Sequence, residues 1–251
     1  MIGVRGVPGE GVPVGGVPVG GVPVGGVPVG GVPVGGVPVR GVPDKAGIRR
    51  AVLSRRAALP PETRDRAGRA AADALAGRAW RKVAAYLAVG GEPETAALLA
   101  ALGEREVLLP VLLPDRDLDW ARADGGIARG PHGLLEPQGR RLGREAVADC
   151  DLVVVPALSV DGNGNRLGRG GGSYDRVLPR TRGWVVALLH DGEMIAPLPA
   201  EPHDAPVHAV VLPSRGLVRL RPHPSDGADT STTGAGTSTT GAGTSTTGRV
   251  T

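Results

Sequence analysis

The sequence predicts an α/β fold, a three-layer α-β-α sandwich with a largely parallel or mixed central sheet, flanked by disordered low-complexity tails. In the middle of the chain, short apolar runs alternate with helical stretches, which is typical of a sheet between helix layers. The run DLVVVP at 151–156 is apolar on consecutive positions, as in a strand covered on both faces. Residues 44–222, between the two low-complexity ends, suffice for one domain with a sizeable core.

The two ends have the composition of unfolded chain. Residues 1–43 contain five consecutive GVPVG units, in which proline removes a backbone donor and glycine makes ordering costly. They resemble elastin-like pentapeptides, and two interpretations stay open: an elastomeric or clustering tether, or a translated tandem repeat without a role. Residues 223–251 repeat TSTTGAG and hold too little apolar surface to fold. We expect both ends to be disordered.

Three helices are expected in the core. In the first, Ile48, Val52 and Leu59 recur at near-helical spacing with basic residues between them, and Pro60 and Pro61 end it. The second is rich in alanine, and the third follows a short glycine-containing loop. The predicted helices are 45–59, 62–80 and 94–102.

Five strands are expected from short apolar runs bounded by turn residues. They are 83–88, 107–113, 151–156, 184–189 and 209–212. In a sheet of this kind ligands gather at the carboxyl ends of the strands. The loop that follows 151–156 is therefore well placed for binding.

Composition argues against several function classes. The formal net charge is only +4, and no basic run with interleaved aromatics is present, so nucleic-acid binding is not expected. No uninterrupted apolar run is long enough for a signal peptide or a membrane span. Cys150 is the single cysteine, which fits a reducing, cytoplasmic setting, and we interpret it as a small core residue.

The stretch RLGRGGGSYDR at 166–176 is the most informative. Its glycines allow positive φ and let backbone N–H groups converge on phosphate oxygens, and its arginines can add charged hydrogen bonds. Ser173 is expected to begin a helix, whose N-terminus also favours an anion. Asp175 is a hard oxygen ligand suited to Mg²⁺. The loop matches neither the G-x-x-x-x-G-K-[ST] nor the G-x-G-x-x-G pattern, and a glycine-rich surface turn stays the alternative.

This loop, with the preceding run from Asp151 to Asp161, resembles the signature of the 5-formyltetrahydrofolate cyclo-ligase family, the 5,10-methenyltetrahydrofolate synthetases. Four further motifs resemble the family's pattern in its order. They are Lys45-x-x-Ile48-Arg49, Glu92-Pro-Glu-Thr95, Gly133-Leu-Leu-Glu136-Pro137 and Leu198-Pro-Ala-Glu-Pro-His203-Asp204. The resemblance covers residues 45–213 and implies the fold and activity of that family.

The resemblance also implies roles for residues at matching positions. Lys45 and Arg49 resemble a basic pair that touches ATP phosphates, and with Arg169 they are the candidate catalytic residues. The implied ATP-binding residues are Lys45, Arg49, Arg166, Leu167, Gly168, Arg169, Gly170, Gly171, Gly172, Ser173 and Tyr174. The implied folate contacts are Leu87, Glu92, Arg169 and Ser173, and Asp175 and Asp204 resemble Mg²⁺-associated aspartates.

Each of these residues also has a simpler interpretation. Lys45 and Arg49, four residues apart, could form a solvated basic helix face. Glu92 could complement a helix dipole, and Asp204 could form a turn. His203 is better explained as a structural residue or an orienter of Asp204 than as a catalyst.

The implied reaction converts ATP and 5-formyltetrahydrofolate into 5,10-methenyltetrahydrofolate, ADP and phosphate. Two positions depart from the family pattern: Ser173 stands where the family has a tyrosine, and Val160 where it usually has phenylalanine. Ser173 therefore leaves open a nucleotide- or folate-binding relative without turnover. A third hypothesis is an interaction protein in which the repeat drives assembly and the domain is passive. A monomer is the default expectation.

Overall fold

The computed structural model describes residues 44–223, apart from 131–133, 196 and 202–203. The main sheet has seven strands in the order β11-β10-β9-β6-β1-β2-β3. Neighbours from β10 to β2 run parallel, and β11 and β3 are antiparallel at the two edges. The strands are β1 Lys82–Ala84, β2 Glu106–Leu112, β3 Leu118–Arg122, β6 Leu152–Pro156, β9 Trp184–Leu188, β10 Ala209–Leu212 and β11 Gly216–Arg219.

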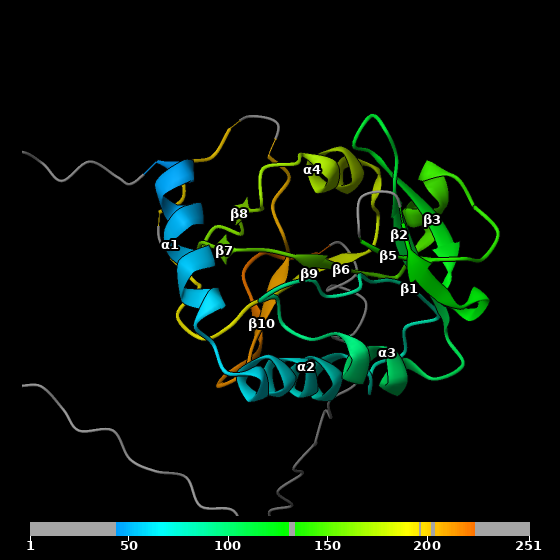
Figure 1. Ribbon diagram of the computed structural model, residues 1–251, viewed down its shortest axis with the longest axis horizontal. Helices are drawn as coiled ribbons and strands as arrows, with labels where there is room; N and C mark the ends of the chain where they lie inside the picture. Colours follow the sequence, from blue (N-terminus) through cyan, green and yellow to red (C-terminus); the bar gives the residue numbers. More distant parts are fainter. Residues whose placement is uncertain (1–43, 131–133, 196, 202–203, 224–251) are drawn as a thin grey trace, which may run out of the picture. The chain divides into compact units, whose positions relative to one another are not determined.

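Four α-helices and three short 3-10 turns occur in the described residues. The helices are α1 Lys45–Ala57, α2 Pro61–Leu75, α3 Ala96–Leu102 and α4 Ser173–Val177. The turns are η1 Ala123–Gly125, η2 Arg144–Asp149 and η3 Leu178–Arg180. Helices α2 and α3 lie on one face of the sheet and α4 on the other (Figure 1).

Each face of the sheet buries its own apolar cluster. On one face, Leu75 of α2 and Leu102 of α3 pack over residues of the central strands such as Val154 and Val186. On the opposite face, Val177 of α4 and Val147 of η2 pack over the alternate strand residues. Since a central parallel strand is covered on both sides, its residues are buried consecutively. The three-layer α/β prediction is confirmed.

Two small hairpins complete the domain. The pair β7 Ser159–Val160 and β8 Arg166–Leu167 packs beside α1, where Ile48, Val52, Leu158 and Leu167 form a third apolar cluster (Figure 1). The other pair joins β4 Ile127–Arg129 to β5 Leu135–Pro137. These hairpins bring α1 and the 134–136 segment to the carboxyl-terminal edge of the sheet.

Several expected bounds were wrong. The helix expected to run to Trp80 ends at Leu75, and the Trp80 indole N–H donates to the Leu75 carbonyl at 3.0 Å, which fills one open acceptor of the last turn. The first helix stops at Ala57 and the third begins only at Ala96. The strand expected at 83–88 is limited to Lys82–Ala84, and the chain then leaves the sheet toward the candidate site. Strands β3 and β11 and both hairpins were not predicted.

Candidate functional site

A cavity of about 620 Å³ opens at the carboxyl ends of β1, β2 and β6. Its walls come from α1, the loop after β1, the segment after β6, the glycine-rich loop and the segment around Asp204. All of the site residues predicted from the sequence line it. They are Lys45, Arg49, Leu87, Glu92, Arg166, Leu167, Gly168, Arg169, Gly170, Gly171, Gly172, Ser173, Tyr174, Asp175 and Asp204.

The glycine-rich loop has the backbone conformation that its composition predicts. Gly170 and Gly172 have φ values of +99° and +73°, which a side chain would strain. Arg49 in α1 fastens the loop, because its Nε donates to the Gly168 carbonyl at 2.9 Å. Ser173 begins α4 as expected, but this helix has only five residues. Any anion binding here therefore depends on the loop amides and arginines more than on a helix dipole.

Lys45 lies between two carboxylates from the far end of the domain. Its Nζ donates to Glu201 at 2.8 Å and to Asp204 at 2.9 Å. Burial alone lowers the pKa of Lys45, but the hydrogen bonds and charges of the two carboxylates outweigh it and raise the pKa overall. The ammonium group is thus held charged at the cavity wall. The interpretation of Lys45 and Arg49 as a solvated basic face does not hold.

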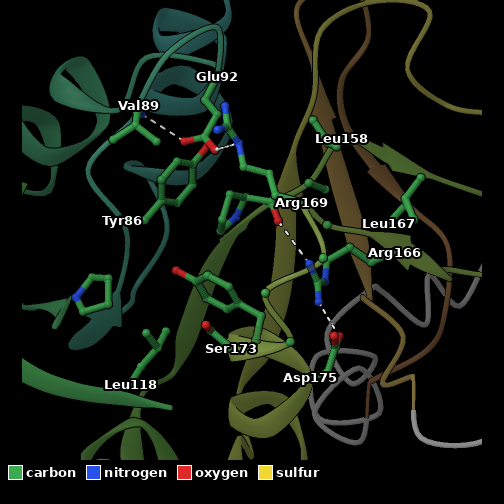
Figure 2. A pocket seen from close by; sticks show the side chains of 18 of the residues that line it. Tyr86, Val89, Glu92, Leu118, Leu158, Arg166, Leu167, Arg169, Ser173 and Asp175 are labelled. Carbon is green, nitrogen blue, oxygen red and sulfur yellow. Dashed lines mark hydrogen bonds and ion pairs between the residues drawn. The ribbon is translucent and has the colours of Figure 1, made fainter. Parts of the chain in front are cut away.

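Glu92 is a buried carboxylate that faces the cavity (Figure 2). One of its oxygens accepts a hydrogen bond from the Val89 amide at 3.0 Å, and the other lies 3.4 Å from the Arg169 Nε. Burial raises the pKa of Glu92 above its ordinary value, although Val89 and Arg169 oppose the shift. When it is protonated, this carboxyl group can donate a hydrogen bond to a ligand as well as accept one.

Two tyrosines line the same cavity as Glu92: Tyr174, which was predicted to bind ATP, and Tyr86, which was not predicted. Tyr86 and Tyr174 both line the cavity, and within the described part of the chain neither hydroxyl has a hydrogen-bond partner. Burial raises the pKa of both phenols, so both stay protonated. A buried hydroxyl without a partner is unfavourable, and a ligand can relieve it. The signal that could have found Tyr86 is its place directly after a buried strand, next to Leu87.

The glycine-rich loop also holds a charged pair. An Nη2 of Arg166 donates to Asp175 at 2.5 Å, and its guanidinium lies 5.8 Å from the centre of the Tyr174 ring (Figure 2 shows the Arg166–Asp175 contact). The two expected metal ligands, Asp175 and Asp204, therefore each contact a cation in the free protein. Gly133 and His203, which belong to the matched motifs, lie outside the described residues.

The residues present fit a metal that arrives with a nucleotide. Among the described residues, no three His, Cys, Asp or Glu side chains gather as a metal site. Mg²⁺ needs no such cage, because it keeps several waters and takes one or two carboxylates together with substrate phosphates. Asp175 and Asp204 line the same cavity and supply carboxylates of this kind.

Comparison with known proteins gives consistent matches over the described domain. Residues 42–213 match the sequence model of the 5-formyltetrahydrofolate cyclo-ligase family. A 5-formyltetrahydrofolate cyclo-ligase from Mycolicibacterium smegmatis is 39% identical over 189 residues, which cover 70% of this chain and 97% of that protein. One from Escherichia coli is 30% identical over 178 residues, covering 65% and 97%. The NMR structure of Aquifex aeolicus 5,10-methenyltetrahydrofolate synthetase superposes with a TM-score of 0.62 at 31% identity, covering 72% and 95%.

Proposed function

Because the chain belongs to the 5-formyltetrahydrofolate cyclo-ligase family, we propose that its cavity binds ATP and 5-formyltetrahydrofolate and forms 5,10-methenyltetrahydrofolate, ADP and phosphate. The observation that carries the proposal is the single cavity that unites a basic pair, a glycine-rich loop and a buried carboxyl group. These groups come from three separate parts of the sequence. They suit an anionic nucleotide on one side and a polar heterocycle on the other.

The reaction needs activation of a poor leaving group. Transfer of the γ-phosphoryl group to the formyl oxygen converts that oxygen into part of a good leaving group and releases ADP. N10 of the same folate then attacks the formyl carbon, the ring closes, and the carbon–oxygen bond breaks with release of phosphate. The protein needs no nucleophile of its own, and its task is to align the two substrates and to stabilise charge.

The place of each residue in the cavity wall indicates which of these tasks it performs. Lys45, Arg49 and Arg169 carry the positive charges that neutralise the phosphates, and the amides of Gly168–Gly172 line the same region. Leu87, Glu92 and Tyr86 form the wall suited to the folate ring. Asp175 and Asp204 are the residues that would hold Mg²⁺, which would supply further charge neutralisation on the phosphates.

Absorbance near the band of the methenyl product tests the proposal with the purified full chain, 5-formyltetrahydrofolate and Mg-ATP. We expect a rise that requires both ATP and Mg²⁺. A flat trace from a folded protein that still binds ATP would favour the relative without turnover. Ser173→Tyr would then test whether the missing aromatic ring is the cause.

The cellular setting is part of the proposal. We propose a cytoplasmic monomer with no nucleic-acid partner and no membrane attachment. The near-balanced charge and the single, buried Cys150 support it, and burial raises the pKa of that thiol to about 12, so it is unreactive. No helix within the described residues is long and apolar enough to cross a membrane. Light scattering of the purified chain would measure its oligomeric state.

A further inference from the structure

A buried charge cluster lies behind the cavity and contacts three of its walls. Its members are Arg56 at the end of α1, His190 after β9, and Glu193 three residues further on, with exposed fractions of 3%, 2% and 0%. None of these residues lines the cavity itself. Charged groups are rarely buried this deeply without a specific arrangement of partners.

Arg56 links α1 to the segment after β6. Its Nε and one Nη donate to the two carboxylate oxygens of Glu193 at 2.9 and 2.7 Å, and the same Nη donates to the Ala157 carbonyl at 2.6 Å. Ala157 lines the cavity. This two-pronged contact fixes direction as well as distance.

The spacing of α1 connects this anchor to the basic pair. Lys45, Arg49, Val52 and Arg56 recur every three or four residues and so lie along one face of the helix. At one end of that face, Lys45 and Arg49 reach the cavity. At the other end, Arg56 reaches Glu193. A shift of the buried end would move the two cations with the helix.

The same cluster reaches the loop that carries Glu92. The His190 amide donates to Glu193 at 2.9 Å, and the His190 Nε2 lies 3.0 Å from the Gly91 carbonyl, to which it donates when it carries the proton. The loop also packs closely on α1, because a Cβ on Gly91 would lie 2.7 Å from the Arg56 Cβ. Glu92, the next residue, is therefore held relative to the same anchor.

Stability alone is a weak reason for such a cluster. Replacing a buried ion pair with apolar side chains of similar volume is often neutral or stabilising, whereas removing one partner leaves a buried charge alone. Unlike apolar side chains, the Arg56–Glu193 pair fixes the position of α1 relative to Ala157 and the loop that contains Gly91. We propose that Arg56 and Glu193 are positioning residues that set Lys45 and Arg49 against Glu92 across the cavity.

The proposal rests on the proposed function, since its main effect is on substrate binding. The double variant Arg56→Met/Glu193→Met removes both charges at once. We expect its melting temperature to fall, because the His190 amide and the Ala157 carbonyl lose buried partners, and the KM values for ATP and folate to rise about fivefold or more, because misplaced groups bind both substrates less well. A folded double variant with unchanged KM values would overturn the proposal.

A second variant covers the case in which the double variant does not fold. Arg56→Lys keeps the buried charge but loses the fork that contacts both oxygens of Glu193. It should raise both KM values by a smaller factor, and unchanged values would count against positioning. Arg180→Met is the matched control: Arg180 binds buried Asp117 with two contacts of 2.9 and 2.7 Å, far along the chain from α1. Its loss should lower the melting temperature and leave the KM for ATP unchanged.

A readout that does not need turnover separates this proposal from the proposed function. If the unchanged protein makes no methenyl product, the proposed function fails. Hydrogen exchange of the amides at 45–49 and 89–92 then decides the positioning proposal. Faster exchange in both segments of Arg56→Lys, but not of Arg180→Met, would support it, and unchanged exchange would refute it.

Discussion

At the scale of single residues, Tyr86 shows how a binding site can depend on a polar group that makes no hydrogen bond in the free protein. Its hydroxyl is buried at the cavity without a partner among the described residues. Tyr86→Phe should raise the KM for folate by about five- to tenfold, because the ligand loses one net hydrogen bond. The KM for ATP should not change, and the melting temperature should not fall, because no hydrogen bond of the free protein is lost.

Ser159→Ala provides the comparison for that prediction. The Ser159 hydroxyl is also buried, but it donates to the Glu193 carbonyl at 2.6 Å. Its removal should cost about 1 kcal/mol of the free energy of unfolding. If Tyr86→Phe destabilises the protein to the same extent and leaves folate binding unchanged, the Tyr86 hydroxyl is structural.

Glu92 predicts a pH dependence of stability. Burial raises the pKa of this carboxyl above its ordinary 4.5, so the folded protein keeps the proton over a pH range in which the unfolded chain has lost it. Within that range, the free energy of unfolding contributed by Glu92 falls as the pH rises. Glu92→Gln should remove this contribution and raise the melting temperature at pH 7, while folate binding weakens.

Melting curves between pH 4.5 and 7 would measure the effect of Glu92→Gln, with exposed Glu104→Gln as the control. The control should follow the unchanged protein throughout. A Glu92→Gln variant with the same pH profile as the unchanged protein would show that burial does not penalise the Glu92 charge.

At the scale of elements, the glycine-rich loop depends on backbone conformation. Gly172 precedes α4 in the left-handed region, with φ of +73°, and an added Cβ would lie 3.0 Å from the Arg176 side chain. Gly172→Ala should therefore cost about 1–2 kcal/mol and shift the loop. We expect a KM for ATP raised by roughly an order of magnitude if that strain is relieved by moving the loop.

Gly162→Ala is the control for Gly172→Ala. Gly162 lies in the preceding turn, its φ is not in the left-handed region, and an added Cβ would meet no atom within 4 Å. Both ATP binding and melting temperature should be unchanged in this variant. Equal behaviour of the two variants would mean that the loop tolerates side chains and that its glycines are not needed for shape.

At the scale of the whole molecule, the division of the chain is itself a prediction. We propose that residues 44–222 fold and act alone, and that the segments 1–43 and 223–251 are dispensable tails. The shortened chain should keep its kcat/KM and melt within a few degrees of the full chain. Turbidity on warming, measured for both, would show whether the GVPVG repeat drives assembly. Loss of activity on shortening would contradict the division.

The order of elements and the chemistry of the loop could be predicted because both are local. Apolar runs such as Leu152–Pro156 identify buried strands, and the glycines of the loop identify unusual backbone. Strand β3 was missed because its short sequence, LDWAR, mixes apolar and charged residues, and Trp120 and Ala121 are buried together in a strand that pairs with β2. Strands β7 and β8 are too short, at two residues each, to leave a periodic signal.

The sequence by itself determined the α/β class, the candidate residues and their family resemblance, because residue type and spacing carry that information. Only the tertiary structure decided the strand order and the contacts that unite the site. Lys45 meets Asp204, and Arg49 meets Gly168, across more than a hundred residues of chain. The sequence likewise does not predict that Arg56 is buried against Glu193, because nothing in it distinguishes Arg56 from the other arginines. Such contacts depend on chain closure and on loss of water around the partners, and neither is encoded in a local pattern.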